Sequence, residues 1–189
     1  ESAKAWKLEQ AASGKQAVSQ AAFTEVTSAS AVLRERFRAL DHEFSGVMQS
    51  TLIWESDGVL CKARPDEIRM EGSVGDIFDL KSMRSVHPDA VAAAVFKYGY
   101  DIQAAAYIEG LEAIGVSAPG LTTFAMLCCE LQPPYLAARY TLNDDFMNIG
   151  RERWALAKAR WAACLSSGEW PGHSGGVLAP PAFAVRQFI

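Results

Sequence analysis

The sequence predicts one α/β domain, in which helices flank a mixed central β-sheet. Two observations predict this class. Helix-type and strand-type segments alternate along the 189 residues, and the run 121–130 is almost wholly apolar, as expected for a buried central strand. The length suits one domain with a sizeable core, so we interpret residues 1–189 as a single domain.

Local patterns predict the order of the elements. Ala, Lys, Gln and Glu dominate the first segment and favour a helix with a break at Gly14, while Asp57-Gly58 is a hairpin turn signal. The expected elements are helices over 1–45, hairpin strands at 50–54 and 59–64, a loop at 69–74, a third antiparallel strand at 75–81, an interrupted helix over 88–110, strands at 121–130 and 136–142, and a helix over 143–166. The apolar face of the last helix is expected to comprise Phe146, Ile149, Trp154, Ala157, Trp161 and Cys164.

Composition excludes some functional classes. Half of the residues are hydrophobic and 21% are charged, as in soluble globular proteins, and no run of 18 apolar residues predicts a membrane span. We therefore expect a cytoplasmic protein with no membrane partner. The four cysteines show no C-x-x-C spacing and are expected to be reduced and mostly buried. The net charge of −4 argues against bulk coating of nucleic acid, but it does not exclude a nuclease with a local basic groove.

Three motifs carry the chemistry: Asp66, the Asp79-Leu80-Lys81 segment, and Gln103 with Tyr107. Two carboxylates on adjacent strands can hold Mg²⁺ or Mn²⁺, because these hard cations prefer oxygen ligands, and the backbone carbonyl of Leu80 could add another. In a strand, Asp79 and Lys81 share one face, so Lys81 would stand beside a metal-bound water. It could orient the water, lower its pKa or stabilise the transition state, and the sequence leaves these roles open.

Gln103 and Tyr107 are four residues apart and share one face of the predicted helix, which Tyr100 could extend. Both can hydrogen-bond a phosphate oxygen or a water. Each motif alone is weak: a lone Asp-x-Lys is usually an exposed ion pair. The order of the motifs in a strand–strand–helix context is much more specific.

With these motifs the sequence resembles the PD-(D/E)XK nuclease superfamily and, more closely, the RecE-type exonucleases (exodeoxyribonuclease VIII). The resemblance lies in residues 60–66, 77–82 and 100–107, and more weakly in the tail with Gly168-Glu169-Trp170-Pro171-Gly172 and Pro180-Pro181. It implies a restriction-endonuclease-like core and a Mg²⁺- or Mn²⁺-dependent exonuclease that degrades one strand of linear duplex DNA 5′ to 3′, in phage-type recombination or DNA repair. It further implies Asp66 and Asp79 as metal ligands, Lys81 as catalytic, Gln103 and Tyr107 as a supporting pair, a strand-annealing partner protein and a homo-oligomeric ring.

The sequence departs from this family in two places. Ser82 stands where the family usually has Thr. The family also places a His or Glu on an early helix, and His42 lies too close to the first strand to fill that role. Because the chain begins without Met, we interpret it as a fragment whose missing site residue lies upstream of Glu1.

Basic and aromatic residues give candidate DNA contacts. Lys62, Arg64 and Arg84 are the nearest candidates to the proposed site. On the last helix, Arg151, Arg153, Lys158 and Arg160 are either a solvated face or phosphate contacts, and Trp54 and Trp170 either pack or stack on an end base. The alternative functions are a nuclease fold used only for binding DNA, an endonuclease, and a RecB-like or Cas4-like enzyme. The cysteine spacing does not fit the iron–sulfur cluster of the Cas4-like group.

Overall fold

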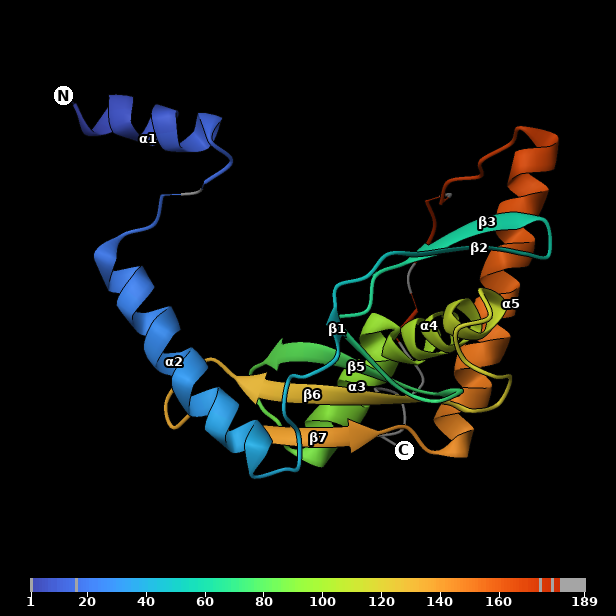
Figure 1. Cartoon of the computed structure of the whole chain (residues 1–189). Helices are drawn as coiled ribbons and strands as arrows, with labels where there is room; N and C mark the ends of the chain where they lie inside the picture. Colours follow the sequence, from blue (N-terminus) through green and yellow to red (C-terminus); the bar gives the residue numbers. More distant parts are fainter. Residues whose placement is uncertain (1, 16, 174, 178, 181–189) are drawn as a thin grey trace.

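The computed structural model describes residues 2–15, 17–173, 175–177 and 179–180. At its centre lies a five-stranded sheet with the strand order β1-β4-β5-β6-β7 (Figure 1). Its strands are β1 (Val47–Met48), β4 (Glu67–Glu71), β5 (Val74–Met83), β6 (Thr122–Glu130) and β7 (Ala137–Thr141). The β5–β6 pair is parallel and the other pairs are antiparallel, so the expected mixed sheet is confirmed.

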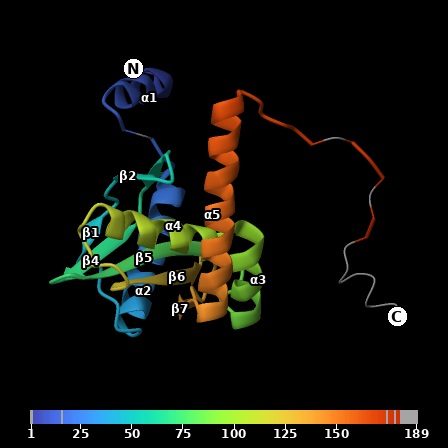
Figure 2. The ribbon, with the colours of Figure 1, turned by 90° about the vertical axis from the view of Figure 1, so that its right-hand side faces the viewer.

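Helices cover both faces of this sheet (Figure 2). They are α2 (Gln20–Arg38), α3 (Pro88–Tyr98), α4 (Tyr100–Ala113) and α5 (Asp144–Ser167), whereas α1 (Ala3–Ala12) has no buried residue and lies apart from the sheet (Figure 1). A parallel strand pair needs a long crossover, and α3 and α4 form the one between β5 and β6. Gly99 ends α3 and starts α4 in a left-handed conformation with φ of 73°, which glycine adopts without a steric penalty. The expected interruption of this helix therefore falls at Gly99.

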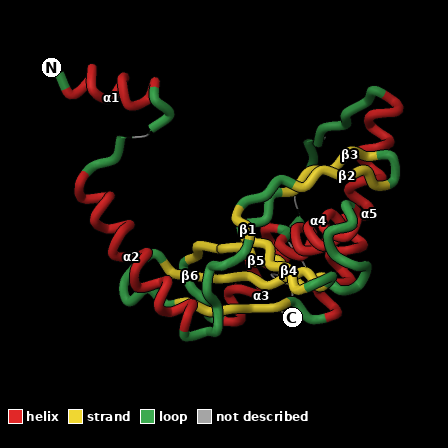
Figure 3. The backbone as a smooth tube through the Cα atoms, in the orientation of Figure 1, coloured by secondary structure: helices red, strands yellow, loops and turns green. Residues whose placement is uncertain are grey.

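The predicted hairpin exists, but it does not belong to the main sheet. Strands β2 (Leu52–Ser56) and β3 (Val59–Ala63) form a separate two-stranded sheet, visible in Figure 3 as a pair of strands apart from the others. The expected pairing of the hairpin with the strand at 75–81 is wrong. The partner of β5 is β4, which covers part of the segment that we expected to be a loop.

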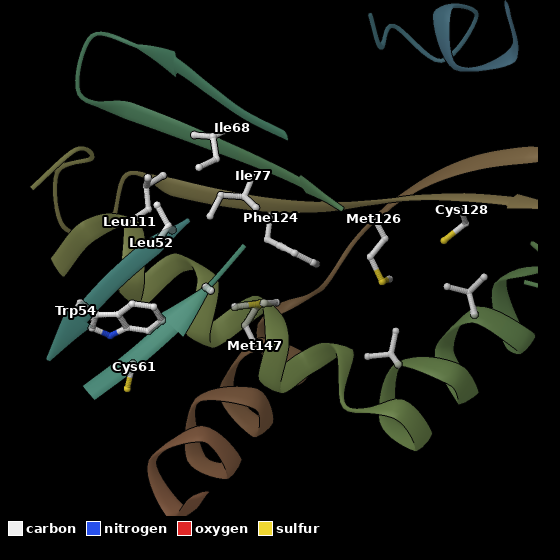
Figure 4. Close-up of a cluster of buried hydrophobic side chains, with 14 of the residues drawn as sticks. Leu52, Trp54, Cys61, Ile68, Ile77, Leu111, Phe124, Met126, Cys128 and Met147 are labelled. Atoms are coloured by element: carbon white, nitrogen blue, oxygen red, sulfur yellow. The ribbon is translucent and has the colours of Figure 1, made fainter. Parts of the chain in front are cut away.

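Two apolar cores lie on opposite faces of the sheet. The larger joins the hairpin, through Leu52, Trp54 and Cys61, to the sheet and to α3, α4 and α5 (Figure 4). The smaller packs Phe37 of α2 against Phe78 of β5. Cys128 belongs to the larger core and Cys129 to the smaller, as the alternation of a strand requires.

The last helix buries only part of the face that we expected: Phe146 and Trp154 pack against the larger core, as predicted. The buried residues of α5 are Met147, Gly150 and Lys158, whereas Ile149 and Trp161 are exposed. Within the described residues, no helix is both long enough and apolar enough to span a membrane.

Candidate active site

The two candidate metal carboxylates lie on neighbouring strands. Asp66 immediately precedes β4, and Asp79 lies in the middle of β5. The antiparallel register pairs Glu67 with Phe78, so its continuation brings Asp66 beside Asp79. The Leu80 backbone N–H donates to Oδ2 of Asp66 at 2.8 Å, which fixes this carboxylate against β5.

Lys81 and Gln103 contact Asp79 directly. Lys81 forms an ion pair with Oδ2 of Asp79, as expected for two side chains on one face of a strand. The Lys81 Nζ also donates to Oε1 of Gln103 at 2.7 Å. The amide nitrogen of Gln103 donates to Oδ1 of Asp79 at 2.9 Å, so one glutamine side chain binds both members of the Asp79–Lys81 pair.

Tyr107 extends this network to the segment before Asp66. The Gln103 amide nitrogen donates to the Tyr107 hydroxyl at 2.8 Å, and that hydroxyl donates to the backbone carbonyl of Arg64 at 3.4 Å. The Gln103–Tyr107 pair of α4 therefore links the backbone two residues before Asp66 to the side chains of Asp79 and Lys81 through hydrogen bonds. The structure brings all five predicted side chains together.

Burial sets the electrostatics of the site. Asp79 is only 4% exposed, and burial raises the pKa of its carboxyl, to which the nearby Asp66 charge adds; Lys81 and the Gln103 hydrogen bond oppose this rise. Burial likewise raises the pKa of the Tyr107 hydroxyl. Tyr107 therefore acts near neutral pH as a hydrogen-bonding phenol.

The donor set fits a small hard cation. Asp66 and Asp79 offer carboxylate oxygens, and Mg²⁺ in proteins commonly binds one or two carboxylates and keeps several waters. No group of three or more His, Cys, Asp or Glu side chains suited to a metal occurs in the described part of the chain. Water and substrate oxygens would therefore complete the coordination shell.

His42 lies on the other face of the sheet from Asp79. It packs edge-on against Phe78, and it shares a hydrogen bond of 2.9 Å with Glu67. Glu67 also accepts from Arg69 and from two backbone N–H groups, so this buried carboxylate is fully engaged. His42 is a structural residue.

An apolar groove lies on the face of β5 opposite the candidate site, and Leu80 lines it. This groove, of about 730 Å³, lies between the sheet and α2 and is lined by Leu33, Phe37 and Leu80 among others. Asp79 and Lys81 point to the opposite face of β5. Leu80 is 45% exposed, whereas its neighbour on the same face, Phe78, is buried.

The candidate DNA contacts divide into two groups. Lys62, Arg64, Arg84, Arg151 and Arg160 are exposed. Arg153 instead forms an ion pair with the buried Asp101, and Lys158 is 6% exposed and pairs with Asp57 and Glu109. These two residues are parts of the scaffold.

The two tryptophans also differ. Trp54 is buried and donates to Glu109, whereas Trp170 is exposed and packs edge-on against Trp161. Trp54 is therefore a core residue.

Sequence reasoning gave no role to one further contact of Lys81. Its Nζ lies 4.4 Å from the centre of the Tyr100 ring, within the range of a cation–π interaction. The signal in the sequence was the helical spacing of Tyr100, Gln103 and Tyr107, which places three polar side chains on one face. The resemblance implied that Gln103 and Tyr107 support Lys81, but nothing in the sequence indicated that Tyr100 contacts it.

The mixed sheet with an Asp, Asp-x-Lys and Gln-x-x-x-Tyr cluster defines a domain of the PD-(D/E)XK type. Residues 8–179 match the family described as PDDEXK-like domain of unknown function (DUF3799), and the chain belongs to this family. Nucleases of this superfamily generally depend on a divalent metal, and membership supports a nuclease.

One solved structure shares this fold. A protein from Eubacterium rectale that is provisionally named an exonuclease has a TM-score of 0.65 and 19% sequence identity, over 89% of this chain and 66% of its own. The present chain thus spans about two thirds of the length of that protein. A structure named SSO0001 has a TM-score of 0.37 and 15% identity, over 70% of this chain and 58% of its own. The search of curated proteins finds no significant match.

Proposed function

We propose that this protein is a Mg²⁺- or Mn²⁺-dependent exonuclease that acts on the ends of linear double-stranded DNA, in the 5′ to 3′ direction. The observation that carries the proposal is the continuous hydrogen-bonded chain from Lys81 through Gln103 to Asp79 and Tyr107, with Asp66 alongside. The name of the Eubacterium rectale protein is consistent with it. The resemblance to RecE-type enzymes adds a role in phage-type recombination or DNA repair, a strand-annealing partner protein and a homo-oligomeric assembly.

Each residue has a role that phosphodiester hydrolysis requires. Asp66 and Asp79 would hold the divalent cation, which supplies charge neutralisation at the phosphate and a water of lowered pKa. Lys81 is held by Asp79 and Gln103 at a fixed position, where its ammonium group stabilises negative charge that develops on the phosphate oxygens. Gln103 and Tyr107 orient these groups and lower the cost of reorganisation during the reaction.

The experiment compares linear duplex DNA, labelled at the 5′ or the 3′ end, with closed circular duplex DNA, each in Mg²⁺ and in EDTA. We expect Mg²⁺-dependent release of nucleotides from the linear duplex and an intact circle. Lys81→Met should lower the cleavage rate by about 100-fold or more, because a preorganised charge on the transition state is commonly worth that much. The matched control is Lys7→Met on α1, a helix without buried residues, and it should cleave at the normal rate.

Two of the alternative functions would give a different result in this experiment. Cleavage of the circular duplex would identify an endonuclease. Binding of linear DNA without any metal-stimulated cleavage would identify a fold used only for binding. Unchanged cleavage by Lys81→Met would refute the assignment of the site.

A further inference from the structure

The two segments that connect the β2–β3 hairpin to the main sheet contact each other beside Asp66. Gln49 follows β1, where the chain leaves the main sheet, and Arg64 follows β3, where it returns. The Gln49 backbone N–H donates to the carbonyl of Asp66 at 2.9 Å and extends the ladder between β1 and β4. Gln49 therefore touches the backbone of a candidate metal ligand.

Gln49 also holds the guanidinium group of Arg64. The Arg64 Nε donates to the backbone carbonyl of Gln49 at 3.1 Å, and Nη2 donates to the Gln49 side-chain oxygen, also at 3.1 Å. A planar guanidinium bound at two points has a fixed orientation. Gln49 thus contacts both ends of the Arg64–Asp66 segment.

Gln49 adopts a backbone conformation that a residue with a Cβ atom disfavours. Its φ is 50°, in the left-handed region. This conformation makes the turn out of β1, and the three hydrogen bonds to Asp66 and Arg64 offset its cost. Strained backbone of this kind is often found at functional sites, where the surrounding contacts maintain it.

The partner of Arg64 is neutral, unlike the partners of Arg69 and Arg153. Arg69 pairs with Glu67, and Arg153 pairs with Asp101, so their charges are compensated. Within the described residues, no carboxylate forms an ion pair with Arg64. An amide partner fixes the orientation of the guanidinium and leaves its positive charge for another ligand.

We propose that Gln49 is a positioning residue that presents Arg64 to a phosphate of the bound DNA strand, next to the cleavage centre. Arg64 is exposed, and its carbonyl is tied by Tyr107 to the catalytic network, so the side chain extends from a fixed point two residues before Asp66. Two of its five N–H groups bind Gln49, and the others are oriented for phosphodiester oxygens. The inference rests on the proposed action on DNA and adds a phosphate contact to it.

The test measures the dissociation constant of end-labelled linear duplex DNA in EDTA, where metal-dependent cleavage does not interfere. We expect Arg64→Ala to weaken binding about tenfold and Gln49→Ala about three- to tenfold, as for a phosphate contact and its orientation. Because Gln49 acts through Arg64, the double variant should bind no worse than Arg64→Ala. Gln49→Glu keeps the side-chain length but adds a charge that pairs with Arg64, and it should weaken binding at least as much as Gln49→Ala.

The control is Gln132→Ala, at an exposed glutamine that takes no part in the contact between Gln49 and Arg64. This variant should bind DNA normally. Thermal melts verify that every variant is folded. Independent, additive losses at Gln49 and Arg64, or unchanged binding by Gln49→Ala, would overturn the inference and leave the nuclease proposal intact. If the coupling is observed but Mg²⁺ gives no cleavage, the nuclease proposal fails and this inference stands. A chain that binds no DNA overturns both.

Discussion

Gly150→Ala tests how closely α5 packs against α4, the helix that carries Gln103 and Tyr107. An alanine Cβ at this position would lie 2.3 Å from the backbone oxygen of Asp101 and 2.7 Å from its carbonyl carbon. Carbon–oxygen contacts between packed helices are about 3.3 Å or longer, so the two helices would have to separate by about 1 Å. The obstacle is helix backbone, which cannot rotate away as a side chain can.

Two opposing effects decide the stability of this variant. Alanine in place of glycine inside a helix normally stabilises by about 1 kcal/mol. Overpacking at a rigid contact typically costs about 1–3 kcal/mol, and a 1 Å deficit falls in the upper part of that range. We therefore expect a net loss of about 1–2 kcal/mol in the free energy of unfolding, measured by urea denaturation.

The displacement should also reach the site, because Asp101 lies two residues before Gln103 on α4. A misplacement of about 1 Å in a positioning group can lower a reaction rate about 100-fold, so we expect Gly150→Ala to cleave linear DNA about 10- to 100-fold more slowly. Glu152→Ala, at an exposed position on the same helix, is the control and should change stability by less than about 0.5 kcal/mol. A Gly150→Ala protein that is more stable and fully active would refute the close packing of α4 against α5.

Three other perturbations test separate parts of the structure. Lys158→Met should destabilise the protein by about 1–3 kcal/mol in urea denaturation, because the partly buried Glu109 carboxylate loses its cation, and a more stable variant would contradict this role. Burial and a nearby arginine lower the pKa of His42 below 6.5. As the pH falls, His42 takes up a proton in the unfolded chain at a higher pH than in the folded protein. The free energy of unfolding should therefore fall as the pH drops below about 6.5, and urea titrations of His42→Gln should show a shallower fall. Tyr100→Leu should lower the cleavage rate about 2- to 30-fold with unchanged DNA affinity, while Tyr100→Phe keeps the ring beside Lys81 and should cleave normally; equal losses in both variants would contradict a cation–π role.

The clustering of the candidate site residues was predictable in part from the sequence because two of their relations are local. Asp79 and Lys81 are two residues apart in a strand, and Gln103 and Tyr107 are four apart in a helix, so simple periodicity places each pair on one face. The relation between the pairs came from the resemblance to a known superfamily. The contact of Lys81 with Tyr100 depends on how the crossover helices meet β5, which no local pattern reports.

The sheet was harder to predict, because its strand β4 is stabilised by tertiary contacts that a local sequence pattern does not show. Glu67 and Arg69 make the β4 segment resemble a polar loop, yet Glu67 is buried and satisfied by His42, Arg69 and the backbone. One residue on the buried face of α5 was missed for a similar reason. Lys158 is buried on it because Glu109 and Asp57 compensate its charge, and a hydrophobicity pattern cannot anticipate this.

The hairpin has a consequence for how this domain can vary and be engineered. It is a closed excursion of the chain, because the backbone leaves and re-enters the main sheet at neighbouring points, Gln49 and Arg64. Changes in the length of such an excursion leave the register of the central strands untouched and add little closure entropy. At its far end Lys158 binds Asp57 at 2.8 Å, and between the two ends Leu52, Trp54 and Cys61 belong to the larger core, so an altered hairpin has to keep these contacts. The exposed face of the hairpin is thus the part that can vary, directly beside the candidate site.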